Sequence, residues 1–203
     1  MFATGRTLLR ASIEEEAQRY DNIIDNLKSY FEANIEKIEN ETKLLRNGYK
    51  DEEVISVISL NETTIDIFRE GLEKCCEMLI VRIHSYAESN LHEMLKQYFG
   101  WSEYKINEEK KAICQNQKSR FSDLETYFVI LIQNKNLSLE LRQEWHDFDQ
   151  FHKLRNQIVH SKAIESSYHI QLTTDYLKKN LSMAENLLQT IDDLYTINNV
   201  QHL

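Results

Sequence analysis

The chain contains no proline and only four glycines in 203 residues. Proline and glycine are the residues that most often end or kink a helix, so their scarcity permits long uninterrupted helices. A β-rich chain of this length needs many tight turns, which depend on Gly, Pro and Asn-Gly pairs. We therefore expect an all-α fold.

The composition is that of a globular protein, with 41% hydrophobic and 28% charged residues, and we expect a single domain over residues 1–203. A net charge of −9 argues against a protein that coats nucleic acid by neutralising phosphates. It leaves room for an enzyme that takes one RNA strand into a small positive pocket.

The three cysteines are odd in number and form no CxxC pair, which indicates reduced thiols in a cytoplasmic protein. The N-terminus lacks the apolar region of a secretion signal. No stretch approaches the 18 uninterrupted apolar residues that suggest a membrane span. We therefore expect a cytoplasmic protein without a membrane partner.

Apolar residues recur at alternating spacings of four and three from Ile13 onward. This pattern predicts one long helix over about 8–46, ended by the turn signal Asn47-Gly48. A helix of this length either crosses a whole bundle or protrudes as a coiled-coil arm.

A short helix over 52–58 is expected next, followed by a capping box at 59–62 that opens a helix stopping near Gly100. The basic stretch 103–120 is predicted to be helical with a loop at each end. A second capping box, at 122–125, opens an apolar helix that reaches about Asn134.

Ser138 is expected to cap the helix that runs into residues 155–160. Thr173 or Thr174 is expected to cap a last helix that ends near Tyr195. The predicted architecture is thus a helical bundle of about six helices with a long N-terminal helix.

Arg155, Asn156 and His160 lie at the end of an amphipathic helix. A guanidinium binds phosphate through forked donors, and an imidazole exchanges a proton near neutral pH. With an amide to orient them, these groups suit metal-free cleavage of RNA by its own 2′-hydroxyl. On an ideal helix, however, positions 155 and 160 lie about 140° apart. Either the helix unwinds at this end, or a second subunit supplies the complementary residue.

The run RNQIVH at 155–160 resembles the signature of the HEPN superfamily, in which a His follows an Arg by five places and a polar residue follows the Arg directly. The aromatic-rich stretch FDQFHKL before it is also similar. Glu88, within HSYAESNLHEML, resembles an acidic residue on an earlier core helix of some HEPN families. The resemblance covers about residues 60–195 and omits the long first helix.

This resemblance implies a metal-independent endoribonuclease, as in toxin–antitoxin, abortive-infection and CRISPR-linked defence systems. In that family two protomers pair so that both motifs line one cleft, and cleavage leaves a cyclic phosphate. Carried over, Arg155 holds the scissile phosphate, His160 is general acid or base, and Asn156 positions one of them. Glu88 contacts these residues and not the substrate, and helps to position them. The implied partners are RNA, a second copy, and an antitoxin or other defence protein, with no cofactor and no metal.

Two further residues belong to the predicted cleft. His152 lies one turn before Arg155, so we expect it to line the same site. Toxins of the nucleotidyltransferase-paired branch carry a Tyr two places after the motif His, where this chain has Lys162. This departure argues against regulation through such a Tyr, although Tyr168 lies in the same loop. Lys162 instead adds positive charge for the RNA backbone.

Three alternatives stay open. In the first, the motif is only a helix end, where Arg155 pairs with a carboxylate and His160 caps terminal carbonyls. In the second, the chain is a non-catalytic HEPN-like interaction or nucleotide-binding module that uses the long first helix.

The third alternative is a metal-dependent hydrolase or ferritin-like protein. His84, Glu88 and His92 recur every four residues, and His146 and His152 follow on another helix. An HEXXH pattern is absent, and the array drifts about 80° around its helix. Hydrogen-bonded or exposed histidines are therefore the preferred interpretation.

Overall fold

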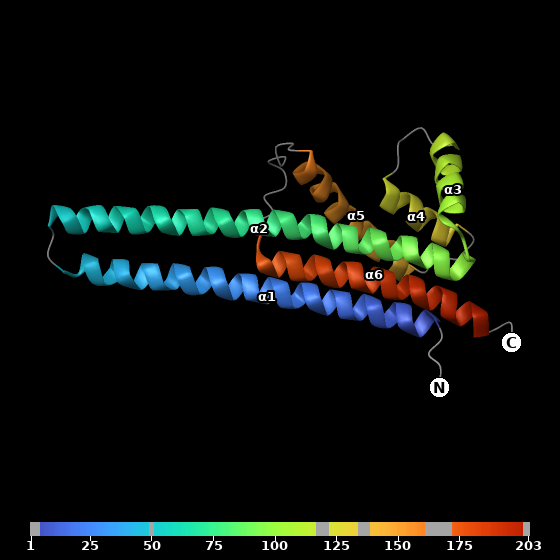
Figure 1. Cartoon of the computed structure of the whole chain (residues 1–203), viewed down its shortest axis with the longest axis horizontal. Helices are drawn as coiled ribbons and strands as arrows, with labels where there is room; N and C mark the ends of the chain where they lie inside the picture. The colour runs from blue at the N-terminus through green and yellow to red at the C-terminus, as the bar shows by residue number, and fades with distance from the viewer. Residues whose placement is uncertain (1–4, 49–50, 117–121, 134–138, 161–171, 201–203) are drawn as a thin grey trace.

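The computed structural model describes residues 5–48, 51–116, 122–133, 139–160 and 172–200. Over these ranges every regular element is an α-helix (Figure 1), which confirms the predicted all-α bundle with a long N-terminal helix. The elements are α1 (Gly5–Arg46), α2 (Glu52–Phe99), α3 (Glu103–Asn116), α4 (Asp123–Ile132), α5 (Leu139–Val159) and α6 (Thr174–Val200). No helix among these described residues is long and apolar enough to cross a membrane.

Helices α1 and α2 form a long antiparallel hairpin (Figure 1). Helix α6 lies along the half of the hairpin that contains the start of α1, and α3, α4 and α5 pack beyond α2. The other half projects as a two-helix arm. The first helix therefore fulfils both expectations, because it crosses the bundle and also forms one strand of a coiled-coil arm.

The register of the arm is fixed by a few side chains between α1 and α2. The amide of Asn61 donates to the Thr42 hydroxyl over 3.1 Å inside the otherwise apolar seam. Nearer the bundle, the ring of Phe31 lies so close to Gly71 that an added Cβ would meet it at 3.1 Å. A polar pair in a coiled-coil seam disfavours other registers, because any shift takes the half-buried Asn61 amide away from this acceptor.

The prediction of a separate short helix over 52–58 is wrong, because α2 is continuous from Glu52 to Phe99. The expected capping box at 59–62 lies inside it. Two hydroxyls just beyond, those of Thr63 and Thr64, donate to the carbonyls four residues earlier and so fit within a helix. The contact side of α2 also continues without a break through this stretch, so packing on α1 outweighs the local signal.

The predicted end of α2 and the predicted start of α6 agree with the structure. Gly100 adopts a left-handed conformation (φ 64°) that ends α2. The Thr173 hydroxyl accepts from the Tyr176 N–H over 3.1 Å and caps α6, which extends to Val200 instead of ending near Tyr195. Ser138, the expected cap of α5, lies outside the described residues.

The capping box that opens α4 is confirmed. The Ser122 hydroxyl accepts from the Glu125 N–H over 3.2 Å, and the Glu125 carboxylate accepts from the Ser122 N–H over 2.7 Å. These bonds satisfy two donors that the first turn of a helix would otherwise leave unpaired.

We expect Ser122→Ala to lower the free energy of unfolding by about 1 kcal/mol, since it removes this cap. Urea denaturation followed by circular dichroism measures the change. Ser182→Ala, an exposed serine within α6, is the matched control and is expected to cost nothing. An equal effect of the two substitutions would contradict the role of the cap.

Candidate functional site, a polar network between α2 and α5

Helix α5 carries the residues of the predicted site toward α2. Its buried face consists of Leu141, Phe148, Phe151 and Leu154. This packing turns the neighbouring His152 inward, where only 4% of it is exposed. One turn further on, Arg155 and Asn156 are half-buried. The amphipathic pattern of α5 thus fixes where these polar side chains lie.

A continuous line of hydrogen bonds joins four side chains. Arg155 Nη1 donates to Asn156 Oδ1 over 2.8 Å. Asn156 Nδ2 then lies 2.9 Å from His152 Nε2, and His152 Nδ1 lies 2.7 Å from His84 Nε2 on α2. The line therefore runs from the end of α5 into the core beside α2.

The donors and acceptors along this line can be assigned in turn. Because Arg155 has no acceptor, it holds the oxygen of Asn156 toward itself, and the amide nitrogen must donate to His152 Nε2. The proton of neutral His152 is then on Nδ1 and is donated to His84 Nε2. His84 in turn carries its own proton on Nδ1. Each ring is thus held in a single tautomer.

Both imidazoles of this pair are held neutral. Burial lowers the pKa of His84 to about 3, and the charges of His152 and Arg155 act in the same direction. Burial also lowers the pKa of His152, although the carboxylates of Glu125 and Asp149 oppose that shift. The pair therefore serves as an uncharged scaffold at neutral pH.

Two buried nitrogens at the ends of the network have no hydrogen-bond partner among the described residues, His84 Nδ1 and Arg155 Nε. Glu88 Oε2 lies 3.9 Å from His84 Nδ1, which is beyond hydrogen-bond range. Burial raises the pKa of Glu88 and the carboxylate of Asp123 raises it further, while the charge of Arg155 opposes the shift. Glu88 thus lies within the electrostatic reach of the network.

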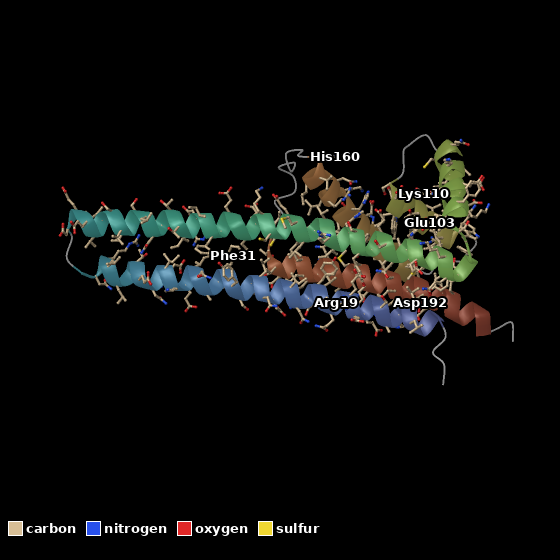
Figure 2. The ribbon with its side chains drawn as sticks, in the orientation of Figure 1. Arg19, Phe31, Glu103, Lys110, His160 and Asp192 are labelled. Atoms are coloured by element: carbon tan, nitrogen blue, oxygen red, sulfur yellow. The ribbon has the colours of Figure 1, made fainter. Side chains whose placement is uncertain are left out.

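His160 lies outside this network. Helix α5 keeps its α-helical pattern up to this residue, since the His160 N–H donates to the Asn156 carbonyl over 3.1 Å. Figure 2 shows His160 at the very end of α5, where its side chain is exposed. The structure therefore brings together Arg155, Asn156, His152 and Glu88 and leaves His160 apart. Of the two alternatives that the sequence left open, unwinding of the helix is not seen up to His160.

The simple helix-end interpretation finds no support among the described residues. Within the described ranges, Arg155 forms no ion pair with a carboxylate, and the His160 ring caps no carbonyl. Lys162 lies outside the described residues.

The histidines proposed as metal ligands have different partners. His84 faces His152, whereas His92 Nε2 lies 3.0 Å from Glu103 Oε2 on α3. His146 is exposed on α5. Across the described part of the chain, no three His, Cys, Asp or Glu side chains are grouped so that they could hold a metal ion.

The residue that sequence reasoning did not assign to this site is His84, which was considered only as a metal ligand. Its position carries a signal, because it falls on the same face of α2 as the apolar Ile80, Ala87 and Leu91. A histidine on such a face must be buried and must find a polar partner. That its partner is His152 follows only from the packing of α5 on α2.

Comparisons of the chain with protein-family models, with curated proteins and with solved structures found no match. Membership of the HEPN superfamily therefore remains a prediction that rests on the likeness of residues 155–160 to its signature.

Proposed function

We propose that this chain is a metal-independent endoribonuclease of HEPN type whose active site is completed by a second copy. The observation that carries the proposal is the state of Arg155. Its guanidinium is anchored by Asn156 and the neutral histidine pair, yet its Nε has no partner among the described residues. A half-buried guanidinium that pairs with no carboxylate among the described residues, five places before an exposed His160 on the same helix, is suited to a phosphodiester.

The chemistry requires only groups that the helix end supplies. A histidine takes the proton of the ribose 2′-hydroxyl, and the 2′-oxygen attacks phosphorus. The bond from phosphorus to the 5′-oxygen breaks, and that oxygen receives a proton from water. The products are a 2′,3′-cyclic phosphate and a 5′-hydroxyl. Arg155 stabilises the charge that develops on the phosphate oxygens.

The straight course of α5 supports a site shared between two copies. On a regular helix Arg155 and His160 point about 140° apart, so one chain does not direct both at the same phosphate. A two-fold axis beside the end of α5 would place the Arg155 of each copy opposite the His160 of the other. Each pairing joins one Arg155 to one His160, so the dimer has two equivalent sites.

The biological setting follows from the resemblance alone. It is that of a cytoplasmic toxin or anti-phage defence effector, restrained by an antitoxin or another protein of the same system. The overall charge of −9 confines RNA binding to a locally positive region, here Arg155 and the predicted contribution of Lys162.

The second candidate function is a non-catalytic interaction module, or one that binds a nucleotide without cutting RNA. One observation favours the interaction module, namely that the α1–α2 arm exposes large apolar side chains, among them Leu44, Leu60 and Ile67. In that case the polar network stabilises the fold and His160 is dispensable.

The test is cleavage of total RNA by purified protein with EDTA present. We expect Arg155→Ala and His160→Ala each to slow cleavage by roughly 100-fold or more, the usual contribution of such a group. Arg142→Ala and His146→Ala are the matched controls, because both residues are exposed on the same helix outside the network. Equal cleavage by all five proteins, or a wild type inert on RNA and harmless to cells, would sink the proposal.

A mixing experiment tests the shared site. If Arg155 and His160 come from different copies, a dimer of one Arg155→Ala chain and one His160→Ala chain keeps one intact site. We therefore expect activity to return when the two inactive proteins are mixed. Mixtures that stay inactive, although the subunits exchange, would place the whole site within one chain.

A further inference from the structure

The α1–α2 hairpin has one covered face and one bare face. Helix α6 covers the first, with ion pairs such as Lys28–Asp175 (3.2 Å) and Lys178–Asp25 (2.8 Å). The opposite face holds an open apolar groove of about 500 Å³ between the two helices, into which Ile23 of α1 and Met78 of α2 both project. Nothing in the described part of the chain covers it.

The bare face gathers most of the exposed large apolar side chains. The described residues include twelve of these. Seven of the twelve each precede, by one position in the sequence, a residue that packs between α1 and α2. In an antiparallel coiled coil such positions of both helices lie on the same side. The seven are 44–74% exposed, and we call them the arm strip: Ile23, Tyr30, Leu44, Val57, Leu60, Ile67 and Met78.

The spacing of the arm strip is self-complementary. Ile23 and Leu44 lie 21 residues apart on α1, and Val57 and Met78 lie 21 residues apart on α2. The Thr42–Asn61 hydrogen bond sets how α1 and α2 are aligned along the hairpin. With this alignment, the point midway between Ile23 and Leu44 lies opposite the point midway between Val57 and Met78, within about two residues or 3 Å. The apolar pattern therefore repeats when the hairpin is turned end over end about that point.

We propose that a second copy of this chain packs antiparallel on the bare face, with its two-fold axis beside Ile67. This arrangement places Ile23 of each copy on Leu44 of the other and Met78 on Val57. The apolar side chains of one tip thus fill the groove near the base of the other arm. The product is a four-helix arrangement with an apolar centre.

The charges on this face have the same symmetry. Arg82 and Glu53 lie at equal distances on either side of the midpoint of α2, and both are exposed. The two-fold axis therefore brings Arg82 of each copy to Glu53 of the other, which makes two ion pairs per dimer. Tyr30 and Lys37 are related in the same way on α1, so the ammonium group meets an aromatic ring.

The area of the face is sufficient for a specific dimer. An interval of 21 residues is about 30 Å long and two neighbouring helices are about 20 Å wide, which gives roughly 1,200 Å² buried over both copies. This value lies at the lower limit of specific interfaces, so the dimer is expected to dissociate on dilution.

This surface is distinct from the proposed nuclease site. Arg82 and His84 are two residues apart on α2, and their side chains therefore point about 160° apart. Because His84 faces α5, the arm strip faces away from it. The two proposals can thus fail separately.

Charge reversal, measured by analytical ultracentrifugation over a concentration series, tests the dimer. Arg82→Glu and Glu53→Arg are each expected to raise the dissociation constant at least about tenfold, because each puts like charges together twice. An equal mixture of the two variants is expected to regain wild-type affinity, because their opposite charges then face each other. Glu70→Arg, an exposed residue of α2 outside the arm strip, is the control and should change nothing.

Ile67→Glu places a carboxylate beside the axis and is expected to abolish the dimer, while circular dichroism shows that the helices remain. The proposal is overturned if wild type is monomeric at every concentration tested, or if Ile67→Glu weakens the association no more than Glu70→Arg does. It is equally overturned if both charge variants dissociate but their mixture does not reassociate. His160→Ala should leave this dimer unchanged whether or not the chain cuts RNA.

Discussion

Acidification from pH 7 to pH 5 is expected to cost the folded state about 2 kcal/mol through His84 alone. The pKa of this imidazole is about 3 in the folded chain because it is buried, against a model value of 6.5. Below pH 6.5 the unfolded chain therefore binds a proton that the folded chain refuses. Stability is fully present above pH 6.5 and is lost progressively as the pH falls toward 3. His152, whose pKa is also lowered, acts in the same direction.

Urea denaturation of wild type and His84→Gln at the two pH values isolates this contribution. Gln carries no charge and can still accept the hydrogen bond of His152, so the pH dependence of this variant should be smaller by about 2 kcal/mol. Glu88, whose pKa is raised by burial, acts in the opposite sense in both proteins and cancels in the comparison. His146→Gln, on an exposed residue, should keep the full wild-type dependence. A His84→Gln protein with unchanged pH dependence would show that His84 already titrates normally.

The helical architecture could be predicted because its determinants are local. The absence of proline, the heptad spacing of α1 and the Ser122–Glu125 capping box each act within a few residues. The break expected near Ser59 did not appear, since a cap signature decides a helix end only when the neighbouring packing is weak. Here the seam between α2 and α1 passes directly through that segment, which a sequence pattern read one window at a time does not reveal.

The candidate site could be predicted only in part. Arg155, Asn156 and His152 share one helix, so their proximity follows from helix geometry. The contact of His152 with His84 joins residues 68 positions apart, and it depends on how α5 packs on α2. Sequence spacing contains no such information.

The hydrogen-bonded network holds the positive charge of Arg155 in place within an acidic protein. Among the described side chains, Arg155 is bounded by Asn156 and the neutral imidazoles, and no carboxylate neutralises it through an ion pair. If the imidazoles were charged, they would repel the guanidinium inside the core. Their low pKa values therefore keep Arg155 in place as well as the fold intact.

Removal of the aromatic ring of Phe148, which packs beside His84, is expected to have the second large effect on stability. Phe148 is fully buried, lies nearly parallel to His84 with ring centroids 6.4 Å apart, and also contacts Phe151. We expect Phe148→Ala to lower the free energy of unfolding by about 3–5 kcal/mol, the usual cost of removing a buried ring. Urea denaturation at pH 7 measures this loss.

The same substitution should change the pH dependence. The new cavity borders the His84 ring, whose Nδ1 has no hydrogen-bond partner among the described residues, so a water molecule can enter and bind there. Hydration weakens the desolvation that lowers the pKa of His84, and the loss of stability between pH 7 and pH 5 should therefore shrink. Phe148→Leu is the matched control, because it keeps the site apolar and filled and should retain the wild-type pH dependence. If Phe148→Ala is strongly destabilised yet keeps the full pH dependence, the ring contributes packing alone, and the neutral state of His84 has another cause.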